Sequence, residues 1–320
     1  MKRLGILMVV LMAIILVSCH EQTKSQQETD QVFTKGTKVK EAENKHSHDH
    51  GDMNLGFDPS VPQVTKLADN VYSYSQFFYN GLIIITNDGV IVTDPAGEPR
   101  AKAMREEIKK LTNKPIIKVV YSHDHYDHTK GGQLFKDEGA RFISHENALD
   151  LITRSSLEDI VVPDVTYKDK MSIELDNGST LDLLYYGRND GDAMTVMYLP
   201  KEKILYAVDF HTPGMLVEPF RLVTLNYSEV YRTLKRVKED LEFDIVISGH
   251  APVSNSELYD MELKFVESLY NKTLEGLKAG KTTEQLMEEL KFPEIEHWMG
   301  YEKNLPGHIQ RMAYSIWHGN

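Results

Sequence analysis

The sequence of 320 residues contains a single cysteine, so no intrachain disulfide can form and the fold must be held by its core. It also lacks a stripe of basic side chains, since 36 Lys and Arg stand against 48 Asp and Glu, for a formal net charge of −12. Binding to phosphate backbones needs such a stripe, which argues against nucleic acid as a partner. Glycine and proline occur at ordinary levels and no heptad repeat is visible, which excludes collagen, coiled coil and general disorder.

Residues 1–18 have the pattern of an export signal. Two basic residues precede an apolar stretch, 4–17, that is too short to span a bilayer comfortably. The stretch ends in Leu16–Cys19, which resembles the lipobox of bacterial lipoproteins, where a cysteine is acylated after cleavage. The resemblance implies an exported protein anchored through Cys19 to a membrane, on its periplasmic or extracellular side. An ordinary cleavage site and an uncleaved anchor helix are the alternatives.

Residues 19–60 have the composition of a flexible, solvated tether, with many Gln, Glu, Lys and Thr and little periodicity. The tether contains His46, His48 and His50. This tract either binds a divalent metal loosely and feeds a buried site, or is merely polar. The folded part of the chain is expected to begin at about Val61.

From Val61 onward the pattern is that of an α/β protein. Strand-like runs at 71–78, 82–86 and 90–93 are joined by Asn80-Gly81 and by 87–89, both typical of tight hairpin turns. Further strands are predicted at 116–121, 140–143, 171–175, 180–185, 194–199, 204–208 and 243–248, and helices at 98–112, 133–137, 146–153 and 228–241. The chain after Ser254 is expected to be helical. The simplest division is one catalytic domain, 61–266, with a helical C-terminal extension, 267–320.

The densest chemistry follows the predicted strand 116–121. His123, His125 and His128 lie there within six residues, together with Asp124 and Asp127. Catalytic sites of α/β proteins usually lie at the carboxyl ends of strands. Three imidazoles beside a buried strand would be costly unless a metal held them neutral. The cluster predicts a metal site, with Zn²⁺ expected, as one or two ions, and Fe²⁺ or Mn²⁺ possible.

This pattern, His-x-His-x-Asp-His, resembles the second motif of the metallo-β-lactamase superfamily, and the resemblance covers about 61–266. It implies a four-layer αββα sandwich, in which two β-sheets pack face to face with helices outside. It also implies that His123 and His125 hold a first metal with a third histidine, while Asp127 and His128 belong to a second.

Three further positions match the family. Asp94, at the end of the strand 90–93, matches an aspartate that orients the ligand loop rather than binding metal. Asp209, after the strand 204–208, matches the carboxylate that bridges the two metals. His250, after the strand 243–248, matches a ligand of the second metal.

The third family motif is altered. Where the family usually has a histidine, this chain has Arg188, followed by Asn189 and Asp190. A guanidinium has no lone pair to give, so Arg188 cannot be a ligand. Either Asn189, Asp190 or His211 supplies the ligand, or the first site stays empty, or Arg188 binds an anionic group of the substrate as a bidentate fork. We expect a weakened first site with Arg188 facing the substrate, and we treat His211 as a second substrate-site candidate.

The sequence therefore predicts a metal-dependent hydrolase at the cell envelope, in which Asp127 orients the attacking water or transfers its proton. Its small-molecule substrate is an ester, lactone, thioester, lactam or related compound, because fold and motifs do not choose among them. Two alternatives remain open. The first is a degenerate metal-binding or scaffold lipoprotein, which Arg188 and the His-rich tether favour. The second is an iron-dependent sulfur dioxygenase of the same family.

Overall fold

The computed structural model describes residues 58–319 of the chain. The predicted signal peptide, the predicted acylation site Cys19 and the tether histidines His46, His48 and His50 lie outside the described residues. Within residues 58–319, no helix has both the length and the hydropathy needed to cross a bilayer.

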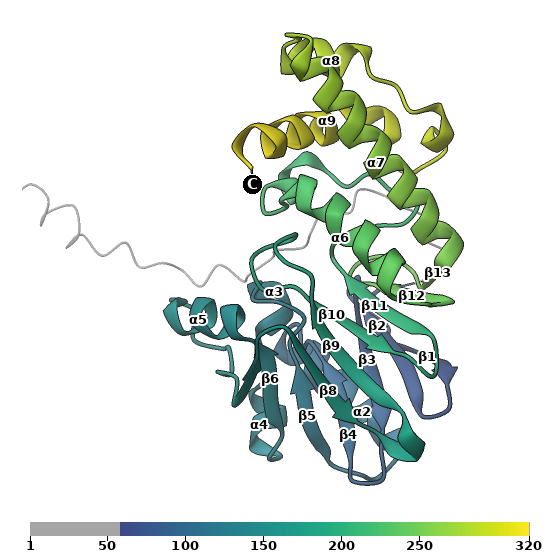
Figure 1. Ribbon diagram of the computed structural model, residues 1–320. Helices are drawn as coiled ribbons and strands as arrows, with labels where there is room; N and C mark the ends of the chain where they lie inside the picture. The colour runs from purple at the N-terminus through teal and green to yellow at the C-terminus, as the bar shows by residue number, and fades with distance from the viewer. Residues whose placement is uncertain (1–57, 320) are drawn as a thin grey trace, which may run out of the picture. The chain divides into compact units, whose positions relative to one another are not determined.

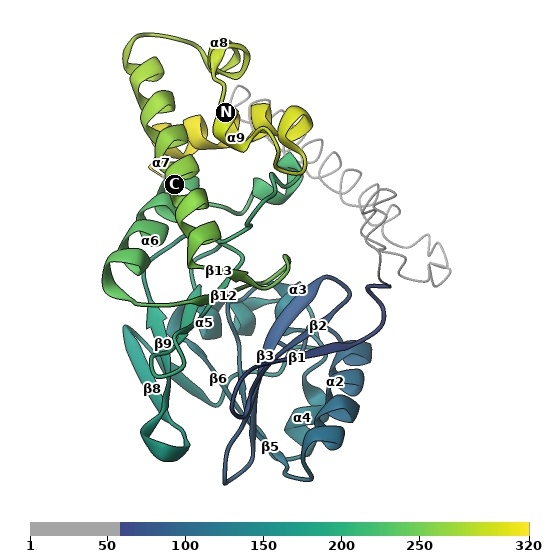
Figure 2. The same ribbon diagram turned by 90° about the vertical axis from the view of Figure 1, so that its right-hand side faces the viewer.

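Two β-sheets packed face to face form the centre of the fold (Figures 1 and 2). The first has seven strands in the order β1-β2-β3-β4-β5-β6-β7, and the second has six in the order β13-β12-β11-β10-β9-β8. Apolar side chains of both sheets, such as Leu82 and Leu183, lie in one continuous core. The strands are β1 (Gln63–Ala68), β2 (Val71–Gln76), β3 (Tyr79–Ile85), β4 (Val90–Thr93), β5 (Ile116–Val120), β6 (Arg141–His145), β7 (Val165–Tyr167), β8 (Lys170–Glu174), β9 (Thr180–Tyr185), β10 (Thr195–Leu199), β11 (Ile204–Val208), β12 (Ile245–Ser248) and β13 (Ser254–Asn255).

Helices cover the outer face of each sheet. On the first sheet, α2 (Glu98–Leu111) buries Ala101, Met104 and Ile108, which recur with the helical period. On the second sheet, α6 (Tyr227–Asp240) and α7 (Ser256–Lys278) bury their apolar faces (Figure 2). The predicted four-layer αββα sandwich is confirmed. Shorter helices are α3 (Tyr126–Thr129), α4 (Gln133–Asp137) and α5 (Glu146–Arg154), with 3₁₀ turns η1 (Asp176–Gly178), η2 (Pro219–Leu222) and η3 (Pro293–Ile295).

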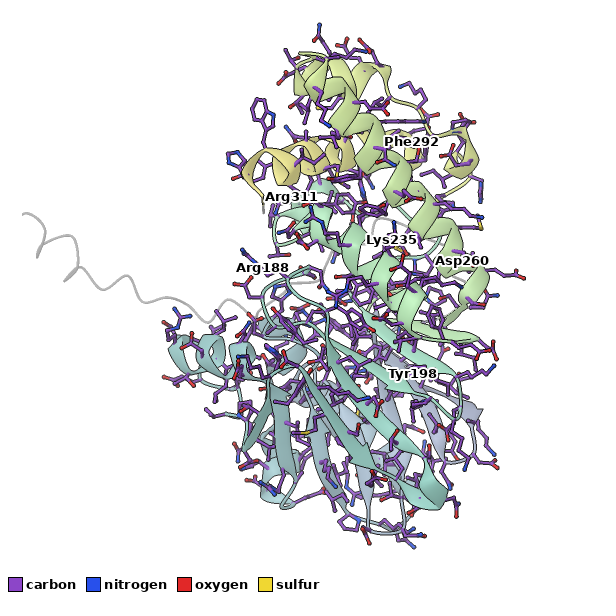
Figure 3. All side chains as sticks on the ribbon, in the orientation of Figure 1. Arg188, Tyr198, Lys235, Asp260, Phe292 and Arg311 are labelled. Atoms are coloured by element: carbon purple, nitrogen blue, oxygen red, sulfur yellow. The ribbon has the colours of Figure 1, made fainter. Side chains whose placement is uncertain are left out.

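The predicted helical C-terminal extension is also present. α8 (Thr283–Glu289) and α9 (Tyr301–His318) lie with α7 at one end of the sandwich (Figures 1 and 2). Phe292, between α8 and α9, sets its ring edge against Phe265 of α7, with 5.3 Å between the ring centroids (Figure 3). The predicted division between residues 266 and 267 falls inside α7, whose buried side chains share one core with the second sheet.

One predicted turn is wrong. The hairpin of β2 and β3 closes at Phe77 and Phe78, with φ of 54° and 64°, rather than at Asn80-Gly81. Asn80 lies inside β3, where its side-chain amide donates to the carbonyl oxygens of Ser248 and Ala251 at 2.9 and 2.5 Å. Left-handed backbone costs a bulky residue about 1 kcal/mol or more, so contacts between the sheets override the local turn preference.

Candidate metal centre

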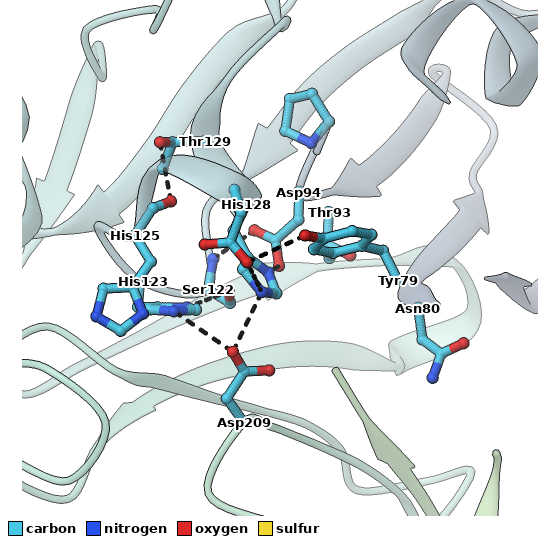
Figure 4. Close-up of polar contacts among 12 residues, drawn as sticks. Tyr79, Asn80, Thr93, Asp94, Ser122, His123, His125, His128, Thr129 and Asp209 are labelled. Atoms are coloured by element: carbon cyan, nitrogen blue, oxygen red, sulfur yellow. Dashed lines mark hydrogen bonds and ion pairs between the residues drawn. The ribbon is translucent and has the colours of Figure 1, made fainter. Parts of the chain in front are cut away.

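The ligand-bearing residues all follow strands that end at the same edge of the sandwich. In the first sheet, β4 and β5 run parallel, and in the second, β11 and β12 run parallel. Parallel neighbours present their carboxyl ends together, so the chain segments after these four strands converge. They carry Asp94, the segment His123–His128, Asp209 and His250. Figure 4 shows several of these side chains pointing toward one another from both sheets.

Two sets of side chains come together there. The first ligand group consists of His123, His125, Asp190 and Asp209, and the second of Asp127, His128 and His250. Within each group the candidate ligand atoms all lie within 4.8 Å of one another.

Asp209 lies between the two groups. Its Oδ2 is 3.6 Å from Nε2 of His123 and 3.2 Å from Nε2 of His128 (Figure 4). The same oxygen is 3.3 Å from Nε2 of His250. With bonds of about 2.1 Å, the ligands of a tetrahedral metal ion lie about 3.4 Å apart. The spacing of these atoms is therefore close to that of ligands around a common metal ion, so these residues fit a divalent metal site.

Unpaired buried atoms also fit a metal. Nε2 of His123, Oδ1 of Asp190 and Oδ1 of Asp209 are buried and accept or donate no hydrogen bond. A buried polar atom without a partner costs free energy, and a cation at this position would remove that cost. The donor set of imidazole and carboxylate suits a divalent transition metal.

Three of the four imidazoles in the two ligand groups are held by their other nitrogen. Nδ1 of His123 contacts the Ser122 hydroxyl at 2.9 Å, and Nδ1 of His250 donates to the carbonyl oxygen of Phe78 at 3.0 Å. Nδ1 of His128 donates to Oδ2 of Asp94 at 3.1 Å. These contacts leave Nε2 of all three rings facing the centre, which is how proteins orient metal-binding histidines.

Asp94 is placed as the resemblance implied, behind the ligands rather than among them. Besides contacting His128, its carboxylate accepts a hydrogen bond from the backbone N–H of Ser122 at 2.8 Å and one from the Tyr206 hydroxyl at 3.3 Å. It is buried, and its own φ of 36° is left-handed. The strain lies directly beside the ligand loop, where strained backbone is often part of a functional site.

Burial and mutual charge set the pKa values of the cluster. Burial and the neighbouring imidazoles hold the pKa of His123 well below its usual value, so the ring is neutral and able to ligate. Burial raises the pKa of Asp190 to about 6. Burial also acts on Asp209, but the charges of His250 and His128 outweigh it and hold its pKa well below the usual range. The raised pKa of Asp190 shows that its buried carboxylate is unfavourable without a nearby cation.

The altered third motif is resolved by Asp190. Its Oδ2 lies 3.8 Å from Nδ1 of His125, whereas Arg188 pairs its Nε with Oδ1 of Asp192 at 2.5 Å. The Arg188 side chain is 53% exposed and lies at the outer edge of the loop (Figure 3). The expectation that Arg188 faces the substrate beside a weakened first site stays a prediction. Its carboxylate partner is Asp192, and Asp190, one of three alternatives, completes the first ligand group.

The loop that carries Asp190 is fastened to the segment before α6. The backbone N–H of Asn226 donates to the carbonyl oxygen of Asn189 at 2.7 Å, and Gly191, with φ of 75°, donates to the carbonyl oxygen of Thr224 at 3.5 Å. A Cβ at Gly191 would lie 3.4 Å from Nε2 of His125. Glycine thus allows the loop to turn and to approach the first ligand group closely.

His211 is not brought to either group. Its ring is fully buried, with Nδ1 against the carboxylate of Glu262 on α7 and Nε2 3.0 Å from the Ser254 hydroxyl. Both ring nitrogens therefore face partners other than a metal or a substrate. The sequence placed His211 two residues after Asp209, but β11 ends at Val208, so the alternation of an extended strand does not apply.

Two functional positions were missed by sequence reasoning. The hydroxyl of Tyr79 donates to Oδ2 of Asp127 at 3.2 Å, but a tyrosine at the start of a strand looks like any aromatic strand residue. Gly249 lies so close to Asp209 that an added Cβ would be 1.8 Å from its Oδ1. The Gly-His pair before Ala251 was the available signal for this close approach.

Comparison with known proteins agrees with this arrangement. A family model described as Metallo-beta-lactamase superfamily matches residues 75–250. The chain is similar to the 2,4-dinitroanisole O-demethylase subunit alpha of Nocardioides sp. (strain JS1661), with 25% identity over 241 residues that cover 74% of this chain and 71% of that protein. It is also similar to a linear primary-alkylsulfatase of Pseudomonas sp. (strain ATCC 19151), with 22% identity over 282 residues that cover 72% of this chain and 52% of that protein.

Two solved structures share the fold. A stereoselective inverting sec-alkylsulfatase from Pseudomonas sp. superposes with a TM-score of 0.66 at 16% identity, over 79% of this chain and 50% of that chain. A metallo-beta-lactamase from Pontibacter korlensis superposes with a TM-score of 0.58 at 20% identity, over 65% of this chain and 99% of that chain. The chain thus spans about half the length of the alkylsulfatases that it matches.

Proposed function

The chain belongs to the metallo-β-lactamase superfamily, and we propose that it is a hydrolase that uses two divalent metal ions, preferably zinc, to cleave a small anionic ester. The observation that carries the proposal is the position of Asp209, whose Oδ2 contacts histidines of both ligand groups. A complete pair of ligand groups supports an active enzyme over a degenerate scaffold protein.

Bound metal ions would polarise the scissile bond and lower the pKa of a water molecule. Asp127 is the carboxylate of the cluster that substrate reaches most easily, since its side chain is 39% exposed against 9% for Asp190 and for Asp209. We assign to it the orientation of the attacking water. A general base must lie within hydrogen-bond reach of that water, and Asp127 is the most exposed of the three carboxylates in the two ligand groups.

Tyr79 supplies a hydrogen-bond donor next to Asp127. Burial raises the pKa of Tyr79 well above its usual value, and the charge of Asp127 adds to the effect, so the hydroxyl stays protonated at neutral pH. A protonated hydroxyl at this position is suited to stabilising negative charge that develops on the substrate. The ring packs its edge against His128 and His250, which fixes the direction of the O–H group.

We assign to Arg221 the recognition of a negative charge on the substrate. It lies on η2, and its charge is close enough to lower the pKa of Tyr79. Its Nε is 3.4 Å from Oε2 of Glu218, a loose ion pair that leaves the guanidinium able to bind another anion. The ring of Phe220, under the same guanidinium at 5.2 Å, is exposed and suits an apolar chain.

These features favour a sulfate ester with an apolar group as the substrate. Two of the proteins that this chain resembles are named alkylsulfatases, and the structural match to one of them covers 79% of this chain, against 65% for the lactamase. A lactam, a lactone and a thioester remain alternatives, because one fold serves many chemistries.

We also propose that the protein acts outside the cytoplasm, tethered to a membrane by an acylated Cys19. The support is the signal-like sequence 1–18 and the ending Leu16–Cys19. Labelling of growing cells with a tagged fatty acid tests the assignment. Label should appear in the wild-type chain and be absent from Cys19→Ala, and label in both would contradict it.

The activity test uses zinc-loaded protein and a set of reporters: an aryl sulfate, a primary alkyl sulfate, a β-lactam, a lactone, a thioester and a neutral acetate ester of matched chain length. We expect sulfate release that stops on chelation and falls at least 100-fold in Asp127→Asn. Turnover of the neutral ester at the same efficiency would contradict recognition by Arg221.

Two other outcomes would overturn the hydrolase assignment. Two tightly bound metals without turnover of any reporter would favour the degenerate scaffold protein. Bound iron together with oxygen uptake on a persulfide would favour the dioxygenase.

A further inference from the structure

The most deeply buried cation in the described part of the chain lies beneath the metal centre. Arg100 on α2 is only 1% exposed, and its guanidinium is surrounded by backbone carbonyls. Nη1 donates to the carbonyl oxygens of Asp94 at 2.7 Å and Pro95 at 3.3 Å, and Nη2 donates to that of Tyr79 at 3.3 Å. Its charged face lies 4.8 Å from the ring centroid of Tyr74.

Stability alone does not explain this residue. No carboxylate among residues 58–319 forms an ion pair with Arg100, and its Nε has no hydrogen-bond partner. Burial of a guanidinium without a paired anion is costly, and an apolar side chain of similar volume would avoid that cost. Its placement therefore needs another reason.

The two residues that Arg100 ties together both act on the second ligand group. The side chain of Asp94 contacts Nδ1 of His128, and the hydroxyl of Tyr79 contacts Oδ2 of Asp127. One planar guanidinium therefore joins β3 to the turn after β4. It bonds the backbone of Tyr79 and of Asp94, the two residues whose side chains make these contacts. A planar fork with fixed donor directions can set the separation of two backbone segments, which a flexible ammonium cannot do.

The surrounding backbone is shaped to admit the guanidinium. The turn that it holds contains two left-handed residues, Asp94 with φ of 36° and Ala96 with φ of 50°. On the opposite side, a Cβ at Gly81 would lie 3.3 Å from Nη2 of Arg100 and 3.0 Å from Oγ1 of Thr93. The strained turn and the glycine are thus both explained by the position of Arg100.

We propose that Arg100 is a positioning residue for the second metal site. It fixes the distance between Tyr79 and Asp94, and thereby the orientation of Asp127 and His128 toward the metal. The inference rests on the proposed function only in requiring that the centre binds metal, and it is independent of the substrate.

The test measures Co²⁺ binding to full-length protein by titration and by the visible absorption of the bound ions. The variants are Arg100→Lys, which keeps the charge but not the fork, and Arg100→Gln. We expect both to lose about tenfold in affinity for one of two Co²⁺ ions, with a changed spectrum, because removal of supporting contacts typically costs 10- to 100-fold. Retention of charge in Arg100→Lys should not rescue the site.

A matched control lies on the same helix. Arg105 pairs its Nε with Oε1 of Glu138 at 2.8 Å, away from both ligand groups. Arg105→Gln should bind two Co²⁺ ions with the wild-type affinity and spectrum. Folded Arg100 variants that behave like this control would overturn the proposal.

A second variant covers the case in which the Arg100 variants do not fold. Gly81→Ala adds a Cβ 3.0 Å from Oγ1 of Thr93 and 3.3 Å from Nη2 of Arg100, so it crowds the guanidinium and its neighbour Thr93 and leaves the charge in place. We expect the same spectral change, smaller in size, and an unchanged spectrum in folded Gly81→Ala would contradict the proposal. Failure of the wild type to bind Co²⁺ would overturn this proposal together with the proposed function. Metal binding without turnover would overturn the hydrolase assignment alone.

Discussion

The two ligand groups are built in different ways. The second group takes His128 from the short helix α3, where Asp94 braces it, and His250 from the turn after β12. The first group takes Asp190 from an irregular loop between β9 and β10 that is fastened to the chain before α6 by main-chain hydrogen bonds. Both groups thus use residues near strand ends, but Asp190 of the first group depends on the course of a loop, whereas His128 of the second depends on a short helix and on side-chain support from Asp94.

Asp209 should matter most, because both groups need it. Asp209→Ala is expected to lose both metal ions and more than about 1,000-fold in activity, since removal of only a supporting contact already costs up to 100-fold. Metal content per chain and kcat/KM are the measurements. Asp192→Asn, which removes an exposed carboxylate paired with Arg188, is the control and should keep both metals. If both variants lost metal and activity to the same extent, the special role of the Asp209 carboxylate would be contradicted.

Gly249→Ala should have the next largest effect. A methyl group there would lie 1.8 Å from Oδ1 of Asp209, so the carboxylate or the backbone must move. We expect loss of one or both metals, a drop in activity of about 100-fold or more, and a loss of about 1–3 kcal/mol in the free energy of unfolding. Urea denaturation and metal analysis check this. Gly139→Ala is the control. An added Cβ there meets no atom within 4 Å but the backbone is left-handed, so this variant measures the loss of stability from backbone strain without a clash.

Asp190→Asn separates the two groups. It should remove the metal of the first group and leave the second occupied, so that the stoichiometry falls from two to one and activity falls about 100-fold. Arg188→Gln, two residues away, should change neither quantity. Loss of metal in Arg188→Gln with full occupancy in Asp190→Asn would show that the loop is arranged differently around the site.

Tyr79→Phe should have the smallest effect on metal and a selective effect on catalysis. The variant removes a donor to Asp127 without removing a ligand, so both metals should stay bound. A fall in kcat of about 100-fold is expected if the hydroxyl stabilises developing negative charge. Steady-state kinetics together with metal analysis distinguish this from a binding defect, and an unchanged kcat would exclude Tyr79 from the reaction.

The site residues that follow predicted strands were easier to predict from the sequence than Asp190, which lies in an irregular loop. Periodicity predicted the strands before Asp94, Asp209 and His250, and the resemblance to the family implied that these three residues belong to the site. The third ligand of the first group was left open among three residues, since an irregular loop has no periodicity from which to read side-chain directions. Only contacts distant in sequence, such as that of Asn226 with Asn189, select Asp190.

The same limit applies to the fold. The four layers and the C-terminal helices follow from helix and strand periods, as the buried face of α2 illustrates. The hairpin at Phe77 and Phe78 was not predictable from turn preferences. Asn80 and Gly81 are used instead for contacts with the second sheet and with Arg100. Local sequence carries no signal of a partner more than a hundred residues away.

The most direct test of the account is the metal stoichiometry of purified protein, measured by titration of Zn²⁺ into the metal-free chain. We expect the wild type to bind two Zn²⁺ per chain, Asp190→Asn to bind one and Arg188→Gln to bind two. A single Zn²⁺ in the wild type, unchanged in Asp190→Asn, would contradict the claim that Asp190 completes the first metal site.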